Sequence, residues 1–216
     1  MFFEMFFGIG IGVAIILAIL AIVGFVTVAF TVGSIWFSRI SFSLLVGLVA
    51  CNQVDIVSNG LLNFVIWAAI GGVITYGLST LPRCAGAISF FCTAFVTTIV
   101  VSLVGGAAFS IYNTIAKTGA DLAITMGFEI LIKAIAAVFG VMAYVKQNEK
   151  GSLVNPSGFV LVNIDRLIAS VIVGVSFVFL YSPWNGNWHT SETLEWIILI
   201  GGTAVTFVAD MFLNKE

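Results

Sequence analysis

A glutamate and a lysine stand four residues apart in a run that is otherwise almost free of charge. They lie in the stretch GFEILIKAI, from Gly127 to Ile135. In a helix, residues at positions i and i+4 share one face about 6 Å apart along the axis, and Glu before Lys is the favourable order for an ion pair. Glu129 and Lys133 are therefore a candidate site for ion or proton exchange.

Two roles fit this pair, and the sequence leaves both open. A structural pair neutralises itself permanently and fixes how the helix packs. A coupling pair lines an aqueous path and exchanges its partner for an ion or a proton. An isolated charge at the bilayer centre costs roughly 2.5–3.5 kcal/mol on insertion scales. The same face continues with Ala136, Ala137 and Gly140, and such small residues favour the interior of a helix bundle.

Asp165, Arg166 and Asp210 form a second charged set inside apolar runs. Adjacent residues on a helix point about 100° apart, so Asp165 and Arg166 are poorly placed to pair with each other. We expect a pair between Asp210 and Arg166 across two helices; the alternative is that each side chain extends to the headgroups. Both charged sets together are the predicted ion or substrate pathway: Glu129, Lys133, Asp165, Arg166 and Asp210.

The composition determines which elements can position these residues. Hydrophobic residues make up 61% of the 216 and charged residues 8%, with a mean hydropathy of +1.19. Soluble domains carry about 25% charged residues, so this chain cannot cover a surface that faces water. The sequence therefore predicts an integral membrane protein whose main partner is the lipid bilayer. A net charge of -2 without a basic cluster does not favour nucleic acid binding.

Apolar runs long enough to cross a bilayer recur along the chain, and polar or proline-containing segments separate them. A spanning helix needs about 20 apolar residues, and no alternating pattern typical of a β-barrel is present. We therefore predict an all-α, polytopic transmembrane helical bundle that forms one domain, 1–216, with no soluble domain. The first run lacks the basic start of a signal peptide and is expected to stay as a membrane helix. The runs cover about residues 6–32, 60–81, 85–112, 121–145, 158–181 and 193–213.

The segment 34–51 is ambiguous, because it is short and contains Arg39 and four serines. It either crosses the membrane or lies re-entrant or interfacial, which gives seven or six spans. With seven spans, five of the six Lys or Arg residues near span ends share one side, and the positive-inside rule makes that side cytoplasmic. We therefore favour a multi-pass protein of the cell membrane with seven spans, the N-terminus outside and the C-terminus in the cytoplasm.

The sequence contains no catalytic constellation. His189 is the single histidine, and the nucleotide-binding, serine hydrolase and zinc protease motifs are absent. We predict no enzyme activity, no bound metal and no cofactor. The leading hypothesis is a small transporter or channel subunit, coupled to ions or protons through Glu129 and Lys133 at mid-bilayer. The alternative is a non-catalytic membrane anchor or assembly subunit. In both cases we expect a homo-oligomer or a place among the membrane subunits of a larger complex.

Overall fold

The computed structural model describes residues 34–116, 126–149, 157–181 and 192–213. These residues form six helices and no strand, which confirms the predicted all-helical class for the described part of the chain. The predicted run 6–32 lies outside the described residues. The helices are α2 (Ile35–Cys51), α3 (Gly60–Leu78), α4 (Pro82–Ala116), α5 (Met126–Glu149), α6 (Phe159–Tyr181) and α7 (Glu192–Leu213).

Within the described ranges, four segments are long and apolar enough to cross a membrane, which is consistent with a multi-pass membrane protein. They are Gly60–Leu78, Pro82–Val100, Phe159–Tyr181 and Thr193–Phe212. The ambiguous segment of the sequence forms α2, an apolar helix of 17 residues that is shorter than these four.

The helix boundaries follow local sequence signals. Ser34 precedes α2 and its hydroxyl accepts a hydrogen bond from the backbone N–H of Phe37 at 3.4 Å. Asn59 precedes α3 and its side-chain oxygen accepts from Leu61 N and Leu62 N. Each side chain satisfies donors that the first turn of a helix leaves without partners. Pro82 opens α4 at the position where a proline costs no hydrogen bond.

α4 is the central helix of the bundle. It packs against α5 and α6 and meets α2, while α3 packs on α2 and α7 on α6. Opposed contacts show that α5 runs antiparallel to α4, because Gly86 lies against Tyr144 and Phe90 lies against Gly140. In the same way, α7 runs antiparallel to α6, because Arg166 lies against Asp210 and Gly174 lies against Thr203.

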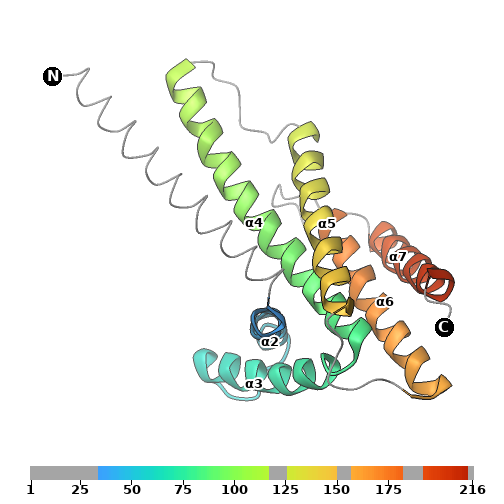
Figure 1. Ribbon diagram of the computed structural model, residues 1–216. Helices are drawn as coiled ribbons and strands as arrows, with labels where there is room; N and C mark the ends of the chain where they lie inside the picture. Colours follow the sequence, from blue (N-terminus) through green and yellow to red (C-terminus); the bar gives the residue numbers. More distant parts are fainter. Residues whose placement is uncertain (1–33, 117–125, 150–156, 182–191, 214–216) are drawn as a thin grey trace.

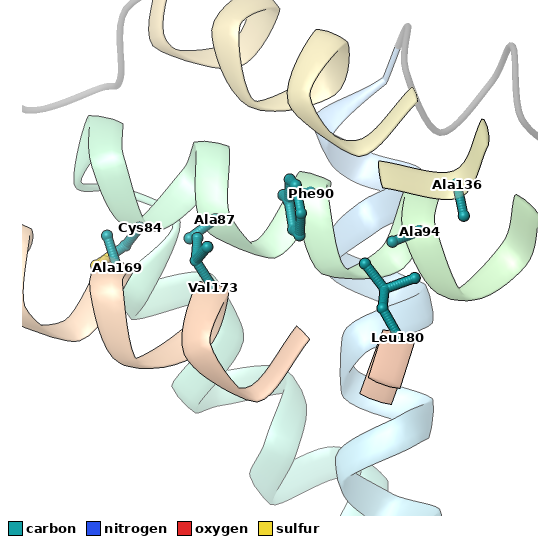
Figure 2. Close-up of a cluster of buried hydrophobic side chains, with 8 residues drawn as sticks. All are labelled: Cys84, Ala87, Phe90, Ala94, Ala136, Ala169, Val173 and Leu180. Atoms are coloured by element: carbon teal, nitrogen blue, oxygen red, sulfur yellow. The ribbon is translucent and has the colours of Figure 1, made fainter. Parts of the chain in front are cut away.

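The core between α4, α5 and α6 is built mainly from small side chains (Figure 2). Ala136 on α5 is completely buried, and a Cβ added to Gly140 would lie 3.0 Å from the Phe90 ring. The small face predicted for this helix therefore packs inside the bundle. Close approach of helix backbones through small residues is typical of helix packing in membranes.

α2 crosses α4 at a steep angle and does not follow its length (Figure 1). The Ser38 hydroxyl lies 3.3 Å from that of Ser89, and Ser38 O accepts from the Cys92 thiol. Phe42, one turn further along α2, packs edge-on against Phe91. The contacts thus stay within one short stretch of α4, and they bury Cys92.

Candidate functional site

Asp165 of α6 caps the N-terminus of α4. Its side chain is fully buried, and its two oxygens accept hydrogen bonds from Arg83 N at 3.3 Å and Cys84 N at 2.9 Å. Since Pro82 has no N–H, these are the first two backbone donors of α4. A carboxylate here also faces the positive end of the helix dipole. One side chain from α6 therefore completes the start of α4.

Asp210 of α7 joins two arginines from two other helices. Arg166 Nε on α6 donates a hydrogen bond to Asp210 Oδ2 at 3.0 Å. Arg83 Nε on α4 lies 2.7 Å from the same oxygen, in a contact between charges in which the N–H is not aimed at the oxygen. Arg83 Nη1 also lies 3.8 Å from Asp165 Oδ2. We call these four residues, Arg83, Asp165, Arg166 and Asp210, the ionic network.

The ionic network has two positive and two negative charges and connects α4, α6 and α7. The expected pair between Asp210 and Arg166 is confirmed, whereas a role in an ion pathway stays a prediction. Sequence reasoning missed Arg83 as a partner of both carboxylates. Its position directly after Pro82, at the start of an apolar run, is the signal that could have placed it at the end of the bundle.

Lys133 binds the C-terminal end of α6. Its Nζ donates a hydrogen bond to the backbone oxygen of Tyr181, the last residue of that helix, at 3.0 Å. The final carbonyls of a helix lack partners within the helix and carry a partial negative charge. The side chain of Glu129 lies outside the side chains that the structure describes, so the pair of Glu129 with Lys133 stays a prediction.

The two charged levels lie toward opposite ends of α6. Sixteen residues separate Asp165 from Tyr181 along this helix, which corresponds to about 24 Å at the rise of an α-helix. The hydrocarbon core of a bilayer is about 30 Å thick. An α6 that spans the membrane would therefore hold the ionic network near one boundary and the Lys133 contact near the other.

Hydroxyl groups lie along α4 beyond the ionic network. Ser89, Thr93 and Thr97 recur every fourth residue and are all buried. Ser89 reaches Ser38 of α2, whereas Thr93 Oγ1 and Thr97 Oγ1 have no hydrogen-bond partner within the part of the chain that the structure describes. This hydroxyl-bearing face of α4 therefore lies inside the bundle.

Arg39 forms a second cationic centre, apart from the ionic network. Its Nε donates to the Ser79 hydroxyl and its Nη2 to the Ser79 backbone oxygen at 3.4 Å. The guanidinium carbon lies 4.9 Å from the ring centroids of both Trp36 and Tyr76. These contacts fasten the start of α2 to the end of α3.

The chain was compared with known protein families, curated proteins and solved structures. No protein-family model, curated protein or solved structure matches this chain. Among the described residues, no group of three or more His, Cys, Asp or Glu residues gathers where it could hold a metal ion.

Proposed function

We propose that this chain is a non-catalytic integral membrane subunit that assembles with other transmembrane chains, either copies of itself or subunits of a larger complex. The ionic network carries the proposal. Asp165 is held by the backbone of α4, and Asp210 is held by two arginines. Fixed partners of this kind set how α4, α6 and α7 pack. A coupling site instead needs groups that change partners during a transport cycle.

The outer faces of the bundle support an assembly role. Most of α7 is not buried by the rest of the structure. On α7, the apolar side chains of Trp196, Ile197 and Ile200 are exposed beside Gly201, which has open space where a Cβ would stand. In a membrane such a face meets lipid or another helix, and glycine permits close approach of a second helix backbone.

The mass and composition of the particle extracted in a mild detergent test this proposal. We expect either a homo-oligomer or co-purification with larger membrane subunits at fixed stoichiometry. Gly201→Leu should reduce the assembled fraction, because its side chain would fill the open side of α7. Gly77→Leu is the matched control, since Gly77 also has open space beside it but lies on α3. A strictly monomeric particle would contradict the proposal.

Transport is the second candidate function, and the unpartnered hydroxyls of α4 favour it. Thr93 and Thr97 are buried polar groups of the kind that line a polar path. The register of α4 on α5, set by the contacts of Gly86 with Tyr144 and of Phe90 with Gly140, continues to place Lys133 at the level of Thr97. Glu129 and Lys133 would then provide ion or proton coupling at one end of that path.

Ion flux into liposomes separates the two candidates. A transporter should give flux in the purified protein, and Thr93→Val with Thr97→Val should abolish it without loss of folded protein. An assembly subunit should give no flux and should tolerate both substitutions, because these hydroxyls have no hydrogen-bond partner among the described residues and valine therefore removes no hydrogen bond.

We also propose an orientation in the cell membrane: seven spans, the N-terminus outside and the C-terminus in the cytoplasm. Arg83 lies at the start of α4, Arg39 and Arg166 lie within the first halves of α2 and α6, and Lys146 lies in the last turn of the antiparallel α5. Basic residues at the end of a bundle favour the cytoplasmic side.

A further inference from the structure

Arg39 is a nearly buried cation that lacks an acidic partner within the described part of the chain. Its relative exposure is 9%, and its contacts are with Ser79 and with two aromatic rings. The arginines of the ionic network, by contrast, are neutralised by Asp165 and Asp210. A charge withdrawn from water needs a counter-charge or a dense set of hydrogen bonds, and Ser79 supplies two hydrogen bonds.

Among the described residues, the contacts of the Arg39 guanidinium group are two hydrogen bonds to Ser79 and two aromatic rings. The Trp36 and Tyr76 centroids are 6.4 Å apart, and each lies 4.9 Å from the guanidinium carbon. Rings on opposite faces would be twice 4.9 Å apart, so the two rings form adjacent walls. A guanidinium has five N–H donors, of which two are given to Ser79. The remaining donors suit the planar, bidentate recognition of a phosphate.

An apolar groove begins three residues further along α2. It has a volume of about 310 Å³ and no polar lining. Phe42 follows Arg39 at a spacing that puts neighbouring side chains on one side of a helix. The groove then runs between α2, α4 and α6, and its walls include Phe42, Val46, Ala50, Phe91, Val171 and Val175.

We propose that Arg39 and this groove bind one anionic phospholipid. The phosphate accepts hydrogen bonds from the Arg39 guanidinium, and one acyl chain lies in the groove between α2, α4 and α6. Two separate features point to the same ligand, because the cation needs an anion, and the groove that begins three residues further along α2 has apolar walls that suit an acyl chain. Trp36 and Tyr76 are the residue types found at the headgroup level of membranes.

The anionic charge of the lipid follows from the charge of Arg39. A zwitterionic headgroup brings its own cation to the site, whereas phosphatidylglycerol brings a net negative charge. Basic residues near a membrane surface gain about 1 kcal/mol each from anionic lipids. On the cytoplasmic side proposed above, this site would face the leaflet that is rich in such lipids, although the binding itself does not depend on that orientation or on the assembly role.

Titration of the delipidated protein in a mild, non-ionic detergent tests the proposal. The probes are palmitoyl-oleoyl phosphatidylglycerol, the phosphatidylcholine with the same chains, dihexanoyl phosphatidylglycerol and inorganic phosphate. Binding is followed by native mass spectrometry and by the shift in unfolding temperature. We expect saturable binding of one long-chain phosphatidylglycerol, with weaker binding of the phosphatidylcholine and of the short-chain lipid.

Variants test the two parts of the site, the Arg39 guanidinium group and the apolar groove, separately. Arg39→Gln should weaken long-chain phosphatidylglycerol binding by about fivefold or more, the factor that corresponds to one basic residue near an anionic surface. Arg39→Lys keeps the charge without the planar fork and should lie between the two. Ala50→Phe fills the groove and should remove the preference for long chains over short ones. Lys146→Gln removes a positive charge away from this site and should bind as the unaltered protein does.

Three results would overturn the proposal. Equal binding of phosphatidylglycerol by Arg39→Gln and the unaltered protein would exclude the phosphate contact. Inorganic phosphate that binds and stabilises as well as the long-chain lipid would indicate a phosphate site without a lipid. No saturable lipid binding to the unaltered protein would mean that protein, such as the apolar segment 6–32 or a second copy, fills the groove. If Arg39→Gln fails to fold, the lipid comparisons on the unaltered protein and Arg39→Lys still decide the question.

Discussion

At the residue scale, the charged side chains of this chain act as connectors between helices. Asp210 contacts two arginines through one carboxylate oxygen, and Asp165 uses both of its oxygens on the backbone of α4. Because Asp165 is completely buried, each lost contact would leave a polar group without water to replace it. Lys133 uses the same chemistry with the opposite sign at the end of α6.

The pair of Asp210 with Arg166 should show energetic coupling. Asp210→Asn and Arg166→Gln should each destabilise the protein in detergent, and the double change should cost less than the sum by roughly 0.5–2 kcal/mol. Asp210→Asn should cost more than Arg166→Gln, because it also leaves Arg83 without this carboxylate. Thermal unfolding of the four proteins measures the coupling, and strict additivity would mean that the two groups act independently.

The contact of Lys133 with the end of α6 can be tested by substitution. Lys133→Met should destabilise the protein by about 1.5–3 kcal/mol, the range for a hydrogen bond to a charged group, and should speed hydrogen exchange in the last turn of α6. Lys146→Met, on the same helix, is the control and should leave that turn protected.

Combining Glu129→Gln with Lys133→Met separates a structural pair from a coupling pair. If the pair is structural, the neutral double variant should fold better than either single variant and should keep the ion flux of the unaltered protein. A coupling pair predicts a folded protein without ion flux. A fully active neutral variant would exclude the coupling role of Glu129 and Lys133.

At the element scale, the bundle depends on close approaches of helix backbones. Gly174 of α6 is the tightest of these contacts, since an added Cβ would lie 2.4 Å from Thr203 Oγ1 and 2.9 Å from the Leu199 backbone oxygen. The backbone oxygen has little freedom to move, so the two helices would have to separate. The Arg166 contact with Asp210 lies on the same pair of helices and would separate with them.

Two glycines provide a matched test of this contact. Gly174→Ala should destabilise the protein, because the steric cost outweighs the roughly 1 kcal/mol by which alanine favours a helix over glycine. Gly201→Ala, on α7, has open space around it and should leave the unfolding temperature unchanged or raise it. Equal effects at the two positions would contradict the close approach of α6 and α7.

The sequence predicted the helices more completely than it predicted their contacts. Runs of apolar residues and the polar breaks between them located α3, α5, α6 and α7 to within a few residues, because a spanning helix has a minimum length. Because Asp165 and Arg166 are adjacent and point in different directions on their helix, the sequence also predicted that Arg166 pairs with Asp210 on another helix. The cap of Asp165 on α4 was not predictable, because it depends on which helices are neighbours, and an apolar sequence contains little information about neighbours.

At the scale of the whole molecule, α4 is the element to which the others attach. α5 and α6 pack along it, α7 reaches it through the shared contact of Asp210 with Arg83, and α2 crosses it near Ser89 (Figure 1). The charged contacts lie toward the ends of the helices, and the core of small side chains lies between them (Figure 2). This arrangement fits a bilayer, where charges are cheapest near the boundaries.

The steep crossing of α2 on α4 makes the number of spans the decisive question for this architecture. If 34–51 crosses the membrane, seven spans place the N-terminus outside. If 34–51 instead lies at the outer surface of the membrane, six spans place the N-terminus in the cytoplasm.

Single cysteines at positions 2, 58 and 216 separate these arrangements. Cys51 is only half-buried, so it is first replaced by serine, while the buried Cys84 and Cys92 stay in place. In intact cells, an impermeant maleimide should label Ser58→Cys and leave Glu216→Cys unlabelled in both arrangements. Labelling of Phe2→Cys from outside is the result expected for seven spans, because an odd number of crossings puts the two termini on opposite sides. Protection of Phe2→Cys, with labelling after the membrane is permeabilised, would instead give six spans, and it would contradict the contact of Arg39 with Ser79 that holds the start of α2 at the same end of α3 as Arg83.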